Sequence, residues 1–252
     1  MEKMALICQG RSGSSVLIRS IDQHPDILLA GEVFIGHNPK VVHHGKWQFP
    51  FLNIFPNRGA SLANRMINYP WGLIRTSSYM KTFFRENEKK GYKVAGFKLM
   101  LGNLKYFPIT RFALKNKLTK RIVLIRENPI EIVISTLKAI EDGYSHLKKD
   151  GKVNHSKVQV DIKNFWTRLE RAEKGNEKLR KIAKDHDSLV INYNELFDWD
   201  NLMKKIFVYL EVDSAKIDPV LKKRSKKNVW DNVSNAEEVI SSLRGTKYEA
   251  YI

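Results

Sequence analysis

The sequence predicts an α/β fold in which a central parallel β-sheet is flanked by helices. Two observations lead to this prediction. Several short runs rich in β-branched residues are typical of buried strands, and segments with helical spacing separate them. The 252 residues are 42% hydrophobic, which suits a well-buried core, and no repeat or linker divides them. Because alternating strands and helices pair in parallel through right-handed crossovers, we expect one domain over residues 1–252.

The expected elements follow one another along the chain. Strands are predicted at residues 4–8, 94–99, 121–125 and 189–192. Helices are predicted at residues 14–23, 79–89, 130–141, 165–185, 201–210 and 236–243. The apolar residues after the first helix, as far as Glu32, continue its helix-like pattern. Residues 45–78 are expected to form an ordered but irregular excursion over one face, and residues 143–157 a mobile loop.

Charge and cysteine content narrow the functional classes. The formal net charge of +17, from 44 Lys and Arg against 27 Asp and Glu, favours anionic partners such as nucleic acid, anionic lipid or small phosphorylated and sulfated molecules. Cys8 is the only cysteine, so an internal disulfide is excluded and a reducing compartment is compatible. The apolar runs are shorter than the roughly 20 residues of a membrane-spanning helix, and no signal-peptide pattern is present. We therefore expect a cytoplasmic protein without a transmembrane segment.

A first candidate site follows the first strand. The turn after it contains Arg11, and the next helix begins near Ser14 and Ser15. The helix N–H groups, the guanidinium and the two hydroxyls would surround a tetrahedral anion with donors, while Gly10 and Gly13 would let the backbone approach it. Ligands gather at such strand ends in open parallel sheets. A simple helix cap after a tight turn explains these residues equally well.

The pattern differs from an ATP-binding loop of the form GxxxxGK[ST]. Counting from Gly10 places Ser15 where the second glycine belongs and Val16 where the lysine belongs. The chain also lacks an evident acidic strand end for magnesium. A sulfuryl group carries less charge than a phosphoryl group and can be transferred without a metal.

A second candidate site follows the strand that ends at Arg126. Asn128 is a suitable N-cap for the next helix, and Ser135 lies nearly two turns into that helix. An arginine at the strand end and a helix hydroxyl facing it would form a second phosphate site. The alternative is that Arg126 pairs with Glu127 or Glu131 on the surface and Ser135 has no special role. These residues alone favour that alternative.

Together the two motifs resemble the nucleotide-binding segments of sulfotransferases that use 3′-phosphoadenosine 5′-phosphosulfate (PAPS). The matching segments are RSGSSVLIRSIDQHPDILLAGEVF and RIVLIRENPIEIVISTLKA. Carbohydrate, Stf0-like and nodulation-type members are the most similar, since they carry arginine in the first loop where cytosolic aryl sulfotransferases have lysine. VINYNELF is similar to a valine-rich strand and YE-L segment of the family, and NVSNAEEVISSLRGTKYEAY to its C-terminal segment. The resemblance implies a P-loop-NTPase-like three-layer sandwich.

The resemblance also implies roles for individual residues, with PAPS as co-substrate and no metal. The 5′-phosphosulfate would be held by Arg11, Ser12, Gly13, Ser14 and Ser15. The 3′-phosphate would be held by Arg126 and Ser135, with Arg244 and Gly245 closing over it. The match at Arg244 and Gly245 is short, and a helix C-cap is its alternative.

The resemblance further implies a catalytic base. Aryl sulfotransferases use a histidine two residues after a strand lysine, but Met100 occupies that place after Lys98. Glu32 matches the glutamate that serves as base in Stf0-like enzymes, Lys98 would approach the bridging oxygen or orient the acceptor, and Arg11 would stabilise the leaving phosphate. The alternatives are an exposed helix-capping carboxylate for Glu32 and a solvated strand-end lysine for Lys98.

The expected function is transfer of a sulfuryl group to a hydroxyl acceptor, a carbohydrate or a glycolipid, with small-molecule partners and no specific nucleic acid. One alternative is a basic nucleic-acid-binding protein, which the charge favours, although no basic patch interleaved with exposed aromatics and no nucleic-acid-reading motif is evident. Another is a nucleotide kinase of related fold, which the missing loop lysine disfavours. The acceptor and the oligomeric state stay open, because unmatched segments would hold the acceptor.

Overall fold

The computed structural model of the chain describes residues 1–35, 52–53, 69–105, 118–142, 157–220 and 228–252. Five parallel strands in these ranges form a central sheet in the order β2-β5-β1-β6-β7. Their bounds are β1 (Glu2–Cys8), β2 (Ile27–Glu32), β5 (Val94–Met100), β6 (Lys120–Ile125) and β7 (Leu189–Asn192). Two short strands, β3 (Phe34–Ile35) and β4 (Leu52–Asn53), pair in parallel beside it. The prediction of an α/β fold around a parallel sheet is confirmed.

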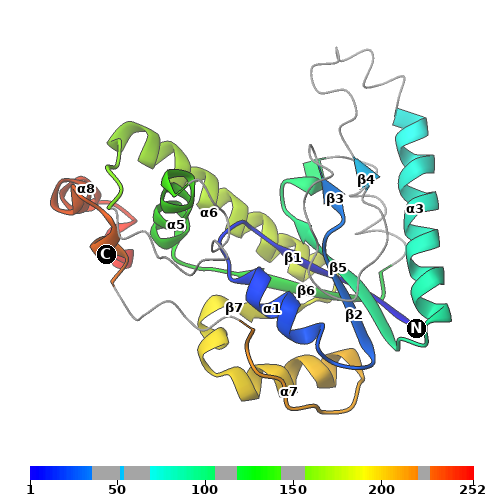
Figure 1. Cartoon of the computed structure of the whole chain (residues 1–252). Coiled ribbons are helices and arrows are strands. Elements are labelled where there is room, and N and C mark those ends of the chain that lie inside the picture. Colours follow the sequence, from blue (N-terminus) through cyan, green and yellow to red (C-terminus); the bar gives the residue numbers. More distant parts are fainter. Residues whose placement is uncertain (36–51, 54–68, 106–117, 143–156, 221–227) are drawn as a thin grey trace.

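Helices cover both faces of this sheet (Figure 1). One face carries α1 (Ser14–Ile21) and α7 (Trp199–Leu210), and the other carries α3 (Tyr69–Lys89) and α6 (Ile162–Asp185). The remaining helices are α5 (Pro129–Glu141) and α8 (Ala236–Leu243). Single 3₁₀ turns are η1 (Asn103–Lys105), η3 (Tyr193–Phe197), η4 (Val229–Asn232) and η5 (Glu249–Tyr251). The result is a three-layer arrangement of helices, sheet and helices.

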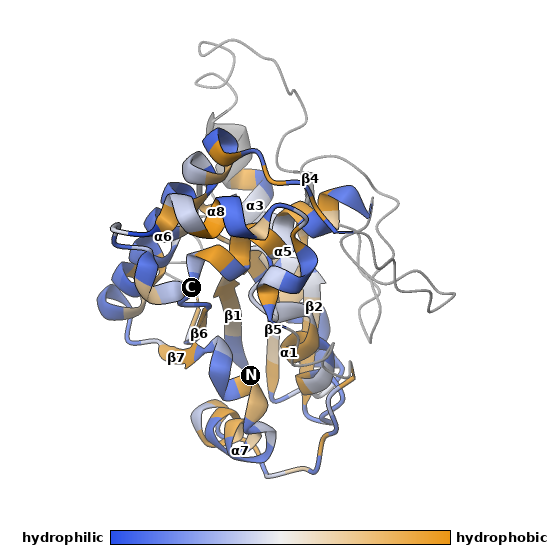
Figure 2. Cartoon of the chain, turned by 90° about the vertical axis from the view of Figure 1, so that its left-hand side faces the viewer, coloured by the Kyte–Doolittle hydropathy of each residue, from blue (hydrophilic) through white to orange (hydrophobic). Residues whose placement is uncertain are grey.

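The alternation of side chains along β1 builds the two halves of the core. Leu6 and Cys8 pack with the helices α1 and α7, whereas Ala5 and Ile7 pack with α3 and α6. A strand covered on both faces buries every side chain, which is why this one reads as a continuous apolar run. Figure 2 shows apolar residues along the central strands, with polar and apolar residues alternating around the covering helices.

A third apolar cluster lies beside the sheet rather than on it. It joins α5 and α8 to the first half of α6, where Phe165 and Leu169 are fully buried. Further along α6, Leu179 packs in the cluster of the sheet. The helix α6 therefore connects the α5–α8 group to the strands, and it runs past the ends of both β1 and β6.

Two predicted elements are wrong. Residues 27–32 form the strand β2 instead of continuing the first helix, because the chain turns after α1 and pairs with β5; the carboxylate of Asp22 accepts the Leu29 N–H at 2.8 Å across that turn. Residues 69–78 belong to α3 instead of an irregular excursion. Its apolar side, including Met80 and Phe83, packs against the sheet.

Other expectations lie outside the described residues. These are the remainder of the excursion at residues 45–78 apart from β4, and the loop at residues 143–156. Within the described ranges, no helix has a stretch long and apolar enough to cross a bilayer.

Candidate functional site

The loop between β1 and α1 presents an uncapped helix N-terminus at the carboxyl end of the central strand. Gly13 is the N-cap residue with φ of 83°, and no side chain caps the helix. Arg11 also has a positive φ, of 62°. The first N–H groups of any α-helix lack an intrahelical acceptor, so this terminus offers donors and a positive dipole end to an anion. Ser15, in the first turn, is half-buried.

Ser12 and Ser14 contribute to the interior of this loop. Ser12 is 1% exposed, and its hydroxyl donates to the Gln9 carbonyl at 2.9 Å. Ser14 is also buried. In this arrangement the Ser12 hydroxyl fixes the shape of the loop, a role that the sequence did not indicate.

The second corner, between β6 and α5, lies directly beside the first because β6 pairs with β1 in parallel. Asn128 caps α5 as expected, accepting the N–H groups of Ile130 and Glu131. The two corners touch at two points. The Arg11 Nε donates to the Ser135 hydroxyl at 3.0 Å, and the Arg126 Nη1 donates to the Arg11 carbonyl at 2.9 Å.

The Arg126 guanidinium has further partners. Its Nε and Nη2 both lie 2.9 Å from the Glu131 carboxylate, so the ion pair considered from the sequence is present. The central carbon of the guanidinium, Cζ, lies 4.2 Å from the centroid of the Tyr193 ring, within the range of a cation–π contact. Arg126 thus contacts the helix that follows it, α5, as well as the first loop and η3. The convergence of the corners therefore exists together with the ion pair and does not exclude it.

The segment η3 covers the first loop. A Cβ atom at Gly13 would lie 2.6 Å from the Leu196 Cδ1 and 3.2 Å from the Tyr193 ring. Glycine is therefore required at position 13 for two reasons, its positive φ and its close packing against η3. The sequence predicted a YE-L segment after the last strand but not that it would cover both corners.

A buried polar bridge links both loops to α6. The Asn176 Nδ2 donates to the carbonyls of Arg126 at 2.9 Å and Glu127 at 3.3 Å, and its Oδ1 accepts from the Gln9 Nε2 at 2.7 Å. Sequence reasoning missed these residues. The available signal was the pair Gly175–Asn176 on the otherwise apolar face of an amphipathic helix, where a small and a polar residue are unusual.

Glu32 and Lys98 form an ion pair on the α1 side of the sheet. Glu32 ends β2 and pairs in register with Lys98 on β5, after an irregularity between Ala30 and Glu32. The Lys98 Nζ lies 3.0 Å from the Glu32 Oε1, with the lysine side chain 11% exposed and the glutamate 41%. Glu32 therefore has solvent access, while its partner is largely buried. The sequence left open that Glu32 caps a helix and that Lys98 is fully solvated, and neither alternative describes this pair.

Cys8 ends β1, directly before the first loop, and its buried thiol donates to the Met100 sulfur at 3.8 Å. Burial raises the pKa of the Cys8 thiol, while the charge of Lys98 and hydrogen bonds with Ser14 and Ser12 oppose that rise. The thiol thus lies among the loop hydroxyls and within electrostatic reach of the pair. A buried, neutral thiol is a core group and no nucleophile.

Arg244 and Gly245 lie just after α8. Arg244 is exposed, and Gly245 has φ of 71° and donates its N–H to the Glu249 carboxylate at 2.8 Å. These contacts are local to the C-terminal segment and fit a helix end. A role at the 3′-phosphate stays a prediction for both residues.

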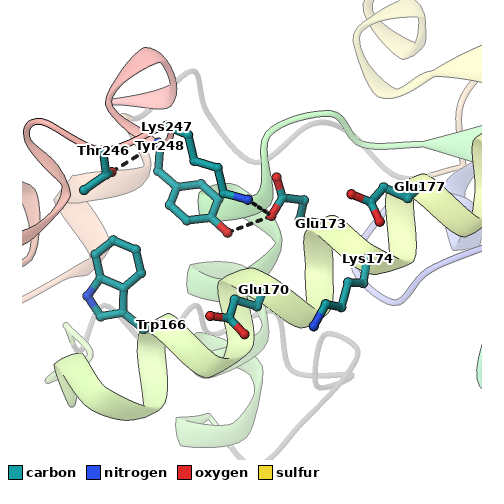
Figure 3. Close-up of a pocket in the computed structure, with 8 residues that line it drawn as sticks. All are labelled: Trp166, Glu170, Glu173, Lys174, Glu177, Thr246, Lys247 and Tyr248. Carbon is teal, nitrogen blue, oxygen red and sulfur yellow. Dashed lines mark hydrogen bonds and ion pairs between the residues drawn. The ribbon is translucent and has the colours of Figure 1, made fainter.

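A cavity of about 390 Å³ lies elsewhere, between α6 and the C-terminal segment (Figure 3). The residues that line it from α6 are Trp166, Glu170, Glu173, Lys174 and Glu177, and residues 246–248 line it from the other side. The Glu173 carboxylate accepts from both Lys247 and the Tyr248 hydroxyl. None of the residues of the two corners lines this cavity. Its three carboxylates outnumber its two lysines, Lys174 and Lys247, so the lining has no excess of positive charge to hold a multiply charged nucleotide. The corners, not the cavity, suit an anionic ligand.

Within the described residues, no group of three or more His, Cys, Asp or Glu side chains is arranged to hold a metal ion.

Comparison with known proteins finds similarity in structure. A sulfotransferase from Alicyclobacillus acidocaldarius is 15% identical, with 100% of this chain and 98% of that chain covered and a TM-score of 0.52. The sulfotransferase domain of the olefin synthase from Synechococcus PCC 7002 is 15% identical, with 85% of this chain and 74% of that chain covered and a TM-score of 0.47. No protein-family model and no curated protein matches the sequence. The first likeness shows that the chain has the α/β fold of a sulfotransferase.

Proposed function

We propose that this protein transfers a sulfuryl group from PAPS to a hydroxyl of a carbohydrate or glycolipid. The observation that carries the proposal is the meeting of the β1–α1 and β6–α5 corners, where Arg11 reaches Ser135 and Arg126 reaches the Arg11 carbonyl. A nucleotide with phosphates at both its 5′ and 3′ positions needs two anion sites in one place. The sulfotransferase-like fold supports the same conclusion.

The donor is bound through its two charged ends. The uncapped N-terminus of α1, Arg11 and the hydroxyls of Ser14 and Ser15 bind the 5′-phosphosulfate. Arg126 and Ser135 bind the 3′-phosphate, with Arg244 and Gly245 closing over it. Arg126 exchanges part of its contact with Glu131 for the phosphate. The 3′-phosphate site distinguishes the donor from ATP.

Glu32 acts as the general base, and the reaction is a direct displacement at sulfur. The acceptor hydroxyl gives its proton to the Glu32 carboxylate as its oxygen forms a bond to sulfur. The bond between sulfur and the 5′-phosphate oxygen breaks, and adenosine 3′,5′-bisphosphate leaves. Arg11 and the dipole of α1 stabilise the charge on the leaving phosphate, and Lys98 orients the Glu32 carboxylate.

The direct test is incubation with labelled PAPS and a panel of glycans, glycolipids and small alcohols, beside the variant Glu32→Gln. The amide keeps the shape of the side chain but cannot take the proton, so we expect unchanged binding of the bisphosphate and a loss of turnover of about 10²–10⁴-fold. Equal turnover by the variant would remove Glu32 from the role of base. Absence of label transfer to every acceptor would leave donor binding as the remaining evidence.

Thermal unfolding separates this function from its alternatives. We expect adenosine 3′,5′-bisphosphate to raise the melting temperature and ATP with magnesium to leave it unchanged. The reverse result would favour a nucleotide kinase. Strongly salt-dependent binding of nonspecific DNA, with no effect of the bisphosphate, would favour a nucleic-acid-binding protein.

The single buried thiol is consistent with the reducing cytoplasm as the site of action.

A further inference from the structure

The two phosphate-binding corners are joined on their inner side by one helix residue. Asn176 is 2% exposed, and all of its side-chain polar groups are engaged: its amide nitrogen by the carbonyls of Arg126 and Glu127, its oxygen by the Gln9 side chain. Gln9 follows β1 and Arg126 follows β6, so a single amide group spans the starts of both loops. The Gln9 Nε2 also donates to the Ala172 carbonyl at 3.0 Å, which attaches the first loop to the backbone of α6.

Two residues at this place, Asn176 and Gly175, are unfavourable for the stability of a plain helix. A buried asparagine costs desolvation, and a glycine inside a helix costs about 1 kcal/mol relative to alanine. Gly175 nevertheless lies in the middle of α6, where a Cβ would be 2.1 Å from the Gln9 Oε1. The glycine makes room for Gln9, and the asparagine binds it. An apolar face made of Leu and Ala would pack the helix but would remove the link between the two loops on this side.

We infer that Asn176, together with Gln9, is a positioning residue that sets the separation of the 5′- and 3′-phosphate sites. This inference rests on the proposed function. On the outer side the loops are already linked through the Arg126 Nη1 and the Arg11 carbonyl. Two links, on opposite sides of Arg126, fix both the position of its backbone and the direction of its side chain. The bridge acts through Arg126 and touches no ligand itself.

The inference predicts a loss of selectivity rather than a general loss of binding. Adenosine 5′-monophosphate needs only the first loop, whereas the bisphosphate needs both loops at the correct distance. In Asn176→Ala we expect binding of the bisphosphate to weaken about tenfold and binding of the monophosphate to change less than about twofold. Gln9→Met, which removes the donor from the other end of the bridge, has the same effect and serves if Asn176→Ala does not fold.

A matched control is Asn87→Ala. Asn87 is likewise buried in a helix and donates to a backbone carbonyl, that of Phe83 at 2.8 Å, but it lies in α3 away from the loops. We expect this variant to lower the melting temperature without changing the ratio of the two affinities. In the double variant Gln9→Met with Asn176→Ala, the ratio falls no further than in either single variant, because both remove the same bridge.

The measurement is isothermal titration of the full chain with adenosine 3′,5′-bisphosphate and adenosine 5′-monophosphate. The inference is supported if the affinity for the bisphosphate, relative to that for the monophosphate, falls in Asn176→Ala and Gln9→Met but not in the control Asn87→Ala. An unchanged ratio in the folded bridge variants overturns the inference alone. Equal binding of the two nucleotides by the unaltered protein overturns the proposed function, and the inference with it.

Discussion

Arg126 is the residue at which the structural and the functional account of this site meet. Its guanidinium binds Glu131, the Arg11 carbonyl and the face of Tyr193. Five N–H donors in a planar fork allow one arginine to keep part of this set while binding a phosphate. A lysine could not do so, which is why the ion pair with Glu131 is compatible with a second role.

We predict that Arg126→Ala weakens binding of adenosine 3′,5′-bisphosphate by about 10–100-fold and binding of adenosine 5′-monophosphate far less, because charged hydrogen bonds contribute about 1.5–3 kcal/mol. Titration of the two nucleotides measures this. Arg180→Ala is the matched control, since it removes an exposed arginine that pairs with Glu127 on the same loop. Equal losses for both nucleotides would contradict a 3′-phosphate role for Arg126.

At the scale of elements, the contact between η3 and the first loop depends on one glycine. In Gly13→Ala the methyl group meets Leu196 at 2.6 Å and the backbone is strained at φ of 83°. We expect a loss of stability of about 2–4 kcal/mol and weaker binding of both nucleotides, measured by urea unfolding and titration.

Gly91→Ala separates the two causes. Gly91 has nearly the same φ, 84°, but no atom lies within 4 Å of the position its Cβ would take. This control carries the strain without the clash, so we expect it to cost about 1 kcal/mol and to leave nucleotide binding intact. If both variants lost the same stability, the packing of η3 on the loop would be unimportant.

The Glu173 carboxylate adds polar bonds to the apolar packing of the C-terminal segment on α6: it accepts from Lys247 and from the Tyr248 hydroxyl. The bond with Lys247 lowers the pKa of Glu173 below its ordinary value of 4.5, and burial, with the bond to Glu173, raises the pKa of Tyr248 to about 12. A carboxyl group whose pKa is lowered by folding stabilises the folded state at every pH above its ordinary, unfolded-state pKa. This contribution is lost as the pH falls through the folded-state pKa.

Between about pH 6 and pH 3 we therefore expect the melting temperature of the unaltered protein to fall more than that of Glu173→Gln, whose amide does not titrate in this range. Glu170→Gln is the control, because Glu170 lines the same cavity and lies one turn away. Parallel curves for all three proteins would show that the ionised Glu173 carboxylate contributes nothing to stability.

The sequence predicted those parts of the elements and site that depend on local pattern. The strands and helices with regular periodicity were found, and so was the proximity of Arg11, Arg126 and Ser135, because the ends of parallel strands meet at one edge. The strand β2 was missed, since a short apolar run cannot be assigned to strand or helix by period alone. The bridge through Asn176 was missed because its partners are far apart in sequence and only tertiary packing unites them.

At the scale of the whole molecule, the two corners and the ion pair of Glu32 and Lys98 belong to one edge of one sheet. In the sheet order β2-β5-β1-β6-β7, the carboxyl ends of the first four strands carry Glu32, Lys98, the Arg11 loop and Arg126 in sequence. The net charge of +17 favours the approach of an anionic donor to the molecule as a whole. The proposed donor sites and the proposed base thus share one edge, which is the arrangement that the proposed sulfuryl transfer needs.

The most direct measurement is a crystal structure of the protein bound to adenosine 3′,5′-bisphosphate. The account predicts the 5′-phosphate at the N-terminus of α1 beside Arg11, and the 3′-phosphate at Arg126 and Ser135, with the Glu32 carboxylate facing the open side of the 5′-phosphate. A nucleotide bound in the cavity between α6 and the C-terminal segment, or with both phosphates at one corner, would contradict the account.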